Sequence, residues 1–239
     1  MRKTAIVTVM TLAVALTVSA GDLDLSPLLT SSELEQLADH VGEAIVMPVG
    51  PARPLGITGF DLRVGGLWVS ADDNATWWGH SLTGAGSAFG GLNGFTASFR
   101  KGLPMGIDVG GQVGTVAGIS FFSAELRKAV FDGGLVEPSV GVRGAWSHLD
   151  SSGLTLDVTS IDLTVSKRFA FLMPYASAGL RHTKAEATLG AGGPSLETVS
   201  KTGITVAAGL HLTLPPLGVR LEVRRGTATA ASLTAGITF

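Results

Sequence analysis

The chain has 239 residues, and its 17 basic and 19 acidic residues give a formal net charge of -2 at pH 7. This small charge argues against a nucleic-acid partner, and the absence of cysteine excludes disulfides and thiolate metal ligands. The 33 glycines and the mean hydropathy of +0.40 are high for a soluble domain and favour a protein in contact with lipid.

Residues 1–20 are typical of a secretory signal peptide. Arg2 and Lys3 form a charged start, an apolar stretch follows, and Val18-Ser19-Ala20 is a small-residue cleavage site. We therefore expect a mature chain that begins near Gly21. Loss of two basic residues changes its formal charge to about -4, since 15 basic residues then remain against 19 acidic ones.

Residues 21–55 are predicted to form a short amphipathic helix and a proline-rich lead into the next domain. The pattern Ser32-Glu33-Leu34-Glu35 predicts a capping box at the helix start. Apolar residues then recur at helical spacing from Leu34 to Ile45, with acidic residues on the other face. Three prolines between 48 and 54 end the helix, because proline interrupts helical hydrogen bonding.

Residues 56–239 alternate between apolar and small or polar residues, which is the period of strands with two different faces. No apolar run after the signal peptide is long enough to cross a membrane as a helix. The pattern predicts an all-β fold, a closed antiparallel transmembrane β-barrel of about ten strands, whose closure satisfies every backbone N–H and C=O group. Eight strands follow if the first or seventh is irregular, and twelve if 72–91 contains a hairpin.

The ten predicted strands are 57–71, 92–101, 106–116, 119–131, 138–149, 154–169, 174–188, 202–214, 217–225 and 231–239. In the sixth strand, Leu156 and Val158 follow one alternation, whereas Ile161 and Leu163 follow the other. This change of parity predicts a β-bulge near Thr159-Ser160.

The two long predicted connections, 72–91 and 190–199, are rich in Gly, Ser and Thr, and they fall at the same end of the barrel. Outer-membrane barrels have short periplasmic turns and longer outer loops, so we expect these two loops outside the cell. Three placements are open for the helix at 34–45: a cap on the periplasmic rim of the barrel, a plug inside its lumen, or a partner-binding element.

The runs Ala124-Glu125-Leu126-Arg127-Lys128-Ala129 and Lys101-Gly102-Leu103-Pro104 resemble a family of uncharacterised Gram-negative outer-membrane β-barrel proteins. The resemblance spans most of the mature chain. It implies location in the outer membrane, with outer-membrane lipids and the barrel assembly machinery as partners. The terminal Phe239 resembles the aromatic signal by which such barrels are recognised for assembly. A more distant similarity to plugged transporters of hydrophobic compounds carries over no ligand residue.

Twelve charged residues are predicted to line the lumen, because they alternate with lipid-facing apolar residues. Opposite charges can pair across a narrow barrel and keep it filled. Alternatively, the excess of arginine makes a polar pore lining that favours anions. The candidates are Asp61, Arg63, Arg100, Asp108, Glu125, Arg127, Arg143, Asp162, Arg181, Arg220, Glu222 and Arg224.

No enzyme, cofactor or metal site is predicted. The five histidines at positions 40, 80, 148, 182 and 211 lack metal-ligand spacing. Two groups contain residue types that a hydrolase on the barrel rim would use, Ser147-His148 with Asp150 and Asp72-Asp73 with His80. Their spacing is not diagnostic, because a catalytic triad is defined in space rather than in sequence.

Five aromatic residues are predicted to anchor the barrel at the two membrane surfaces, where amphipathic rings prefer the headgroup level. Those assigned to the outer rim are Trp77 and Trp78, and those assigned to the inner rim are Phe169, Phe171 and Tyr175.

The function expected from the sequence is a narrow or gated conduit for small solutes or hydrophobic molecules, with the N-terminal helix as a gate. The alternative is a structural or adhesive barrel with a filled lumen, and a rim hydrolase is the least favoured function. Lumen width decides between the first two, since a small barrel is largely filled by its own side chains.

Overall fold

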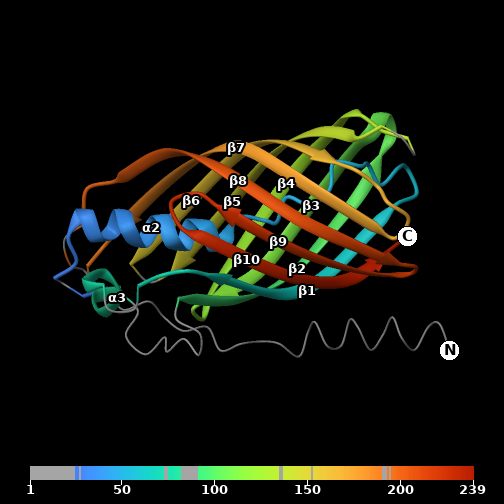
Figure 1. The fold of residues 1–239 in the computed structure, drawn as a ribbon. Coiled ribbons are helices and arrows are strands. Elements are labelled where there is room, and N and C mark those ends of the chain that lie inside the picture. Colours follow the sequence, from blue (N-terminus) through green and yellow to red (C-terminus); the bar gives the residue numbers. More distant parts are fainter. Residues whose placement is uncertain are drawn as a thin grey trace.

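In the computed structural model, ten antiparallel strands close into a barrel around one helix (Figure 1). The predicted signal peptide 1–20 and the mature start at Gly21 lie outside the described residues. Within the described part of the chain, no helix is long and apolar enough to span a membrane. The structure describes residues 25–26, 28–72, 75–81, 91–134, 137–151, 153–189, 193 and 195–239.

Each strand pairs with its neighbours in the sequence, and β1 pairs with β10 to close the barrel. This confirms the prediction of a closed barrel with about ten strands. Most strand bounds lie within a few residues of those expected from the alternation. The strands are β1 (Phe60–Val69), β2 (Leu92–Leu103), β3 (Ile107–Val116), β4 (Ile119–Phe131), β5 (Ser139–Ser151), β6 (Leu154–Ser166), β7 (Leu172–Ala187), β8 (Val199–Leu214), β9 (Leu217–Arg225) and β10 (Thr229–Thr238).

The two ends of the barrel differ in their connections. At the end where β1 begins and β10 finishes, all four connections are short, and one of them is the 3-10 turn η1 (Pro104–Gly106). We call this the turn end. The opposite end, the loop end, carries the long connection 70–91, which includes helix α3 (Thr76–Ser81), and the connection 188–198.

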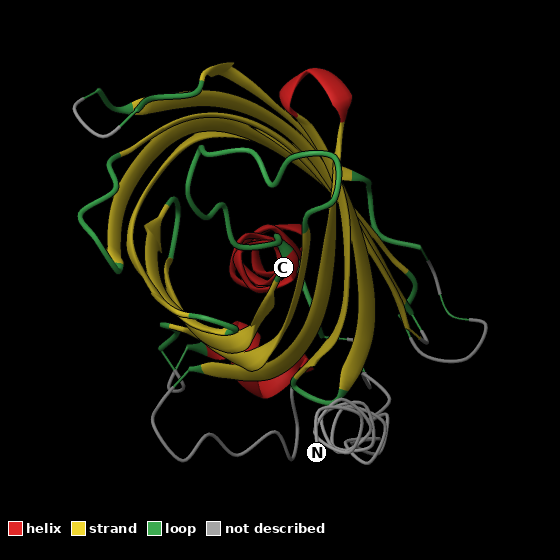
Figure 2. Ribbon diagram, turned by 90° about the vertical axis from the view of Figure 1, so that its right-hand side faces the viewer, coloured by secondary structure: helices red, strands yellow, loops and turns green. Residues whose placement is uncertain are grey.

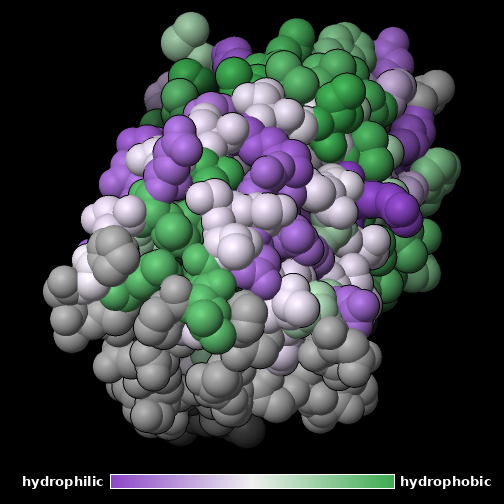
Figure 3. All heavy atoms as spheres, turned by 90° about the vertical axis from the view of Figure 1, so that its left-hand side faces the viewer, coloured by the Kyte–Doolittle hydropathy of each residue, from purple (hydrophilic) through white to green (hydrophobic). Residues whose placement is uncertain are grey.

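The outer surface of the barrel wall is apolar. Side chains that alternate with buried ones along each strand are exposed, and Ile204 and Ile161 reach 72% and 65% exposure. A surface of this kind is stable only in contact with lipid, since soluble monomers rarely expose large apolar patches. Seen from the loop end, polar and near-neutral residues cover much of the described face, and hydrophobic residues follow the flank of the barrel (Figure 3).

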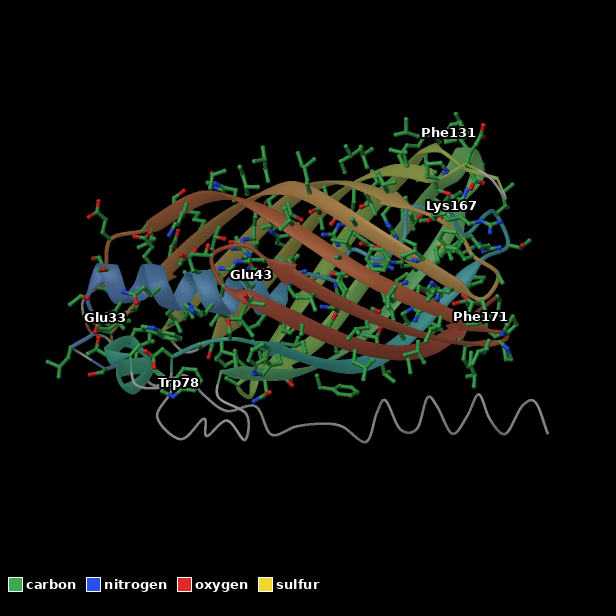
Figure 4. All side chains as sticks on the ribbon, in the orientation of Figure 1. Glu33, Glu43, Trp78, Phe131, Lys167 and Phe171 are labelled. Atoms are coloured by element: carbon green, nitrogen blue, oxygen red, sulfur yellow. The ribbon has the colours of Figure 1, made fainter. Side chains whose placement is uncertain are left out.

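Helix α2 (Ser31–Ile45) lies inside the barrel, so the plug is the correct placement of the three (Figure 2). It contacts strands β1 to β8 and β10. Its first turn is at the loop end, as the position of Glu33 shows (Figure 4). The predicted start at Ser32 was slightly wrong, because Thr30 is the N-cap and forms the capping box with Glu33.

The loop-end half of the lumen is lined by apolar side chains that pack on α2. We call this the apolar half. Leu34, Leu37 and Ile45 of the helix are completely buried in it. The wall residues of the apolar half are Val69, Leu92, Val116, Ile119, Phe121, Leu149, Leu154, Leu156, Val158, Ala185 and Ala187.

The predicted bulge in strand β6 is wrong. The strand pairs with β5 and β7 without a register shift from Leu154 to Ser166. Leu156 and Val158 point into the lumen toward α2, whereas Ile161 points out to lipid. The inward and outward positions alternate regularly along the whole strand. The inward residues change from apolar to polar, and this change gave the apolar residues an apparent change of parity. A register shift does occur elsewhere, between Ala129 and Phe131 of β4.

Two of the five predicted membrane-anchoring rings lie in the interior instead. Trp77 is 2% exposed and stacks on His40 of α2, with ring centroids 4.9 Å apart. Tyr175 is 4% exposed, because its position on β7 has the parity of the inward residues. Phe169 and Phe171 are exposed and lie in the connection between β6 and β7 at the turn end, where an anchoring ring belongs. Figure 4 shows Phe171 at this end.

Candidate functional site in the barrel lumen

The chain that leaves helix α2 continues through the lumen to the turn end as an extended stretch without regular secondary structure, residues 46–55. We call this stretch the luminal segment. A buried backbone without helix or sheet pairing needs other partners for its N–H and C=O groups. Pro48, Pro51 and Pro54 reduce this requirement, since proline has no backbone N–H.

Arginines of the wall satisfy the carbonyl groups of the luminal segment. The guanidinium group suits this task, because it carries five donors in a rigid plane and stays charged. Each of three strands contributes one arginine. These hydrogen bonds run from Arg143 Nη1 to the Met47 carbonyl (2.7 Å), from Arg100 Nη2 to the Pro48 carbonyl (2.7 Å) and from Arg127 Nη2 to the Pro51 carbonyl (2.6 Å).

Acidic and hydroxyl side chains satisfy the N–H groups of the same segment. The carboxylate of Glu222 accepts from the N–H groups of Val49 and Gly50 at 3.0 and 2.9 Å, and it also accepts from the hydroxyl of Tyr175 at 2.8 Å. Two further bonds run from the Ala52 N–H to Ser166 Oγ and from the Leu55 N–H to Asp108 Oδ1, both 3.1 Å.

Glu43 of α2 is a buried acidic residue that joins the C-terminal end of the helix to the wall. Its side chain is completely buried and forms ion pairs with Arg181 and with Arg224 Nε, the latter at 2.9 Å. Arg224 also donates to the carbonyls of Glu43 and Val46 (3.3 Å to Val46). A cation at this place satisfies free carbonyls of the helix end and opposes the negative end of the helix dipole.

Glu43 is one of the acidic residues that helical spacing places on the polar face of the helix, but its pairing with arginines of the wall was not predicted. One signal was available: an acidic residue in the last turn is unfavourable for the helix dipole. Such a residue indicates a cationic partner from elsewhere in the chain. Figure 4 shows Glu43 deep in the barrel, far from Glu33 at the loop end.

Two further groups of opposite charges brace the wall toward the turn end. Glu125 pairs with Arg100 and, at 3.5 Å, with Arg143, which also binds Asp162 at 2.6 Å. The second group is centred on Asp61, which pairs with Arg63 Nε at 2.9 Å and with Arg220 Nη2 at 3.3 Å. Buried pairs of this kind fix geometry more than they add net stability.

All twelve charged residues predicted to face the lumen are buried, and none is more than 8% exposed. Most of them are in contact with α2, with the luminal segment or with one another. We call those toward the turn end, together with the luminal segment that they hold, the charged half of the lumen. The structure therefore brings the predicted residues together, although many of their partners are backbone groups that no side-chain pattern indicates.

Of the two groups considered for hydrolysis, the one that the structure describes in full, Ser147-His148 with Asp150, does not form a common site. Ser147 is buried in the wall's inward face, whereas His148 is partly exposed and binds Asp157 at 2.9 Å. Asp150 instead accepts a hydrogen bond from Thr155 at 3.3 Å. Asp73 and the side chain of His80 lie outside the described part. Within that part, no group of three or more His, Asp or Glu side chains could hold a metal ion.

Comparison with protein-family models and with curated proteins gave no match. Among solved structures, the N-terminal β-barrel domain of Pseudomonas aeruginosa OprF is 14% identical over 77% of this chain and 99% of its own, with a TM-score of 0.37. Ail of Yersinia pestis is 16% identical over 76% and 98%, with a TM-score of 0.37. Neisserial surface protein A is 14% identical over 75% and 95%, with a TM-score of 0.33.

Likeness at this level indicates no function, and the expected distant resemblance to plugged transporters of hydrophobic compounds gains no support from it. The closed wall and the apolar exterior of the barrel are the observations that indicate its location in a membrane. A β-barrel with an outward apolar band is the β-architecture that spans bacterial outer membranes. This chain is a β-barrel protein of the Gram-negative outer membrane.

Proposed function

We propose that this protein is a structural barrel that exposes its loop end at the membrane surface. It forms no open passage through the membrane, because its own N-terminal chain fills the lumen. This is the second of the three functions that the sequence left open. The observation that carries it is the burial of helix α2 among inward side chains from all round the wall. Such burial is what a permanent filling requires.

The free energy needed to remove α2 from the lumen supports a resting state in which the barrel is closed. Four completely or almost completely buried side chains of α2, Leu34, Leu37, Val41 and Ile45, would have to leave the apolar half. Their burial contributes roughly 6–12 kcal/mol, at about 1.5–3 kcal/mol for each side chain. Breaking the buried ion pairs of Glu43 adds a further cost of about 3–5 kcal/mol. Spontaneous opening is therefore rare.

Planar-bilayer conductance tests this proposal. The mature chain is expected to be electrically silent, whereas a variant that lacks residues 25–54 is expected to conduct. A second, full-length variant, Leu37→Asp, places a charge in the apolar half and should also give openings, and Leu28→Asp, at a 70% exposed position, is its control. Steady conductance by the unmodified chain would overturn the proposal.

We infer that the loop end faces outward, because short turns belong on the periplasmic side of such barrels. A protease-sensitive tag in the connection 188–198 should be cut on intact cells, and a tag at Gly133 should be protected. The reverse pattern would place the start of α2 on the periplasmic side.

A gated conduit for small or hydrophobic solutes is the second candidate, favoured by one observation. The N-terminal chain is held by packing, hydrogen bonds and ion pairs, and a cavity of about 200 Å³ already lies beside the luminal segment at the turn end. A passage would then need the movement of α2 and of the luminal segment.

A reversible cross-link separates these two functions. A Cβ atom on Gly42 would lie 3.5 Å from Thr183 Oγ1, so Gly42→Cys with Thr183→Cys places a disulfide between helix and wall. The chain has no cysteine of its own. For a gated conduit, oxidation should abolish uptake of a hydrophobic probe into liposomes, and a reductant should restore it. For a structural barrel, uptake should be absent in both states. The two single-cysteine variants are the controls.

A further inference from the structure

The cavity of about 200 Å³ at the turn end lies between the luminal segment and the wall. It is larger than the roughly 150 Å³ cavity that accommodates a benzene molecule. Unlike that apolar cavity, it has seven charged residues in its lining. The arginines of its lining are Arg53, Arg100, Arg127, Arg168 and Arg220.

The acidic residues of the same lining are Asp61 and Asp108, so five arginines and two aspartates give a formal charge of +3. This excess is local, since the whole chain has a formal charge of -2. It is also opposite in sign to that balance. The cavity therefore concentrates positive charge at one end of the lumen.

Two of these arginines lack the carboxylate partners that the other luminal arginines have within the described residues. Among the described residues, no carboxylate lies within 4 Å of the guanidinium of Arg127 or Arg168, although Arg127 does donate to the Pro51 carbonyl. Arg220 has one ion pair, with an Asp61 that it shares with Arg63. The Nε atom of Arg220 is buried and has no hydrogen-bond partner. The guanidinium N–H groups that do not hold the luminal segment remain available to bind a ligand.

We propose that the turn-end cavity binds a small oxyanion of the phosphate class. Guanidinium groups recognise phosphate oxygens through paired, charge-assisted hydrogen bonds. Arg127 and Arg220 would form the inner part of the site, and Arg168, an exposed residue next to Phe169, would form its entrance. Free phosphate and the phosphate of a lipid headgroup offer the same chemistry. The site does not depend on movement of α2.

Calorimetric titration of the full protein in dodecyl maltoside with sodium phosphate tests the site, with sodium chloride at equal ionic strength as the reference. Arg127→Gln should weaken phosphate binding by about tenfold or more, and Arg168→Gln by about threefold, since each removes a charged donor. Arg168 makes no hydrogen bond or ion pair within the described residues, so its variant tests the site even where Arg127→Gln fails to fold.

Arg225→Gln is the matched control. It makes the same change at an exposed position at the loop end of β9, away from the cavity lining. It should bind phosphate as the unmodified protein does. Equal weakening in Arg225→Gln and Arg168→Gln, or no phosphate-class ligand bound at all, would overturn the proposal.

A second measurement identifies the source of the oxyanion. Short-chain phosphatidylglycerol is added before the phosphate titration, and native mass spectrometry records any phospholipid that remains bound. Competition with phosphate, lost in Arg168→Gln, identifies a lipid headgroup as a ligand of the site. Phosphate binding that the lipid leaves unchanged identifies the free anion.

Discussion

The two halves of the lumen are built on the same strands and the same alternation, yet they hold the plug by different means. In the apolar half, leucine, valine and alanine side chains pack against a helix that satisfies its own backbone hydrogen bonds. In the charged half, arginine and carboxylate side chains bind the backbone groups of the luminal segment, which has no helix or sheet pairing of its own. The inward surface of each half thus supplies what the enclosed chain lacks. The helix receives apolar packing, and the luminal segment receives hydrogen-bond partners for its backbone.

This difference explains where charge is found in the barrel. A helix needs partners for its backbone groups only at its ends, and Arg224 supplies them to the carbonyls of Glu43 and Val46 at the C-terminal end of α2. An extended chain needs partners along its whole length.

Removal of the carboxylate of Glu43 should have the largest effect, because it leaves Arg181 and Arg224 buried without their partner. Glu43→Ala should lower the free energy of unfolding in detergent by about 3–5 kcal/mol. Glu35→Ala is the control on the same helix, since Glu35 pairs with Lys201 in a partly exposed position. It should cost less than about 1 kcal/mol. Equal effects would contradict a central role for Glu43.

A cavity in the apolar half should have the next largest effect. Leu37→Ala removes most of a completely buried side chain, and the free energy of unfolding should fall by about 2–5 kcal/mol. Leu28→Ala, at a 70% exposed position, should change it by less than about 0.5 kcal/mol. A small loss in Leu37→Ala would mean that α2 is loosely held.

The hydroxyl group of Tyr175 tests the charged half. Tyr175→Phe removes the 2.8 Å hydrogen bond to Glu222 and keeps the ring. The unfolding free energy should fall by about 1.5–3 kcal/mol, the range for hydrogen bonds to charged groups. Thr155→Val removes an exposed hydroxyl at the loop end, whose bond to Asp150 is 3.3 Å long, and should have little effect.

Substitutions at two glycines should change the unfolding free energy least, and in opposite directions. Gly42→Ala should raise the unfolding free energy by about 0.5–1 kcal/mol, because alanine favours a helix and its Cβ would lie 3.5 Å from Val158. Gly50→Ala should lower stability, since Gly50 has φ of +68° and its Cβ would lie 2.9 Å from Arg220 Cζ. Thermal unfolding of both variants measures this difference in sign.

Much of the fold could be predicted from alternation alone. The parity of Ile204 or Arg143 was sufficient to place one toward lipid and the other toward the interior, because strand side chains alternate strictly. The helix was equally clear from its spacing. What failed was the assumption that an inward residue is polar. Leu156 and Val158 violated it, and a bulge was inferred where the wall is regular.

The placement of the plug and its contacts could not be predicted for a different reason. An amphipathic helix fits a rim and a lumen equally well until the inward surface that covers its other face is known. The partners of Arg143 and Arg100 are carbonyl groups of residues 47 and 48, and every residue has a carbonyl group. Only the three-dimensional path of the chain selects which ones are bound.

The direction of the plug has a consequence for how the protein is made. Helix α2 starts at the loop end, and the luminal segment reaches the turn end before β1 begins there at Phe60. The seam between β1 and β10 therefore joins the first and last strands around a chain that precedes both. Insertion of the plug into a finished barrel would require threading it past the charged half. We therefore expect the wall to fold around the N-terminal chain, with the pairing of β1 and β10 as the final step.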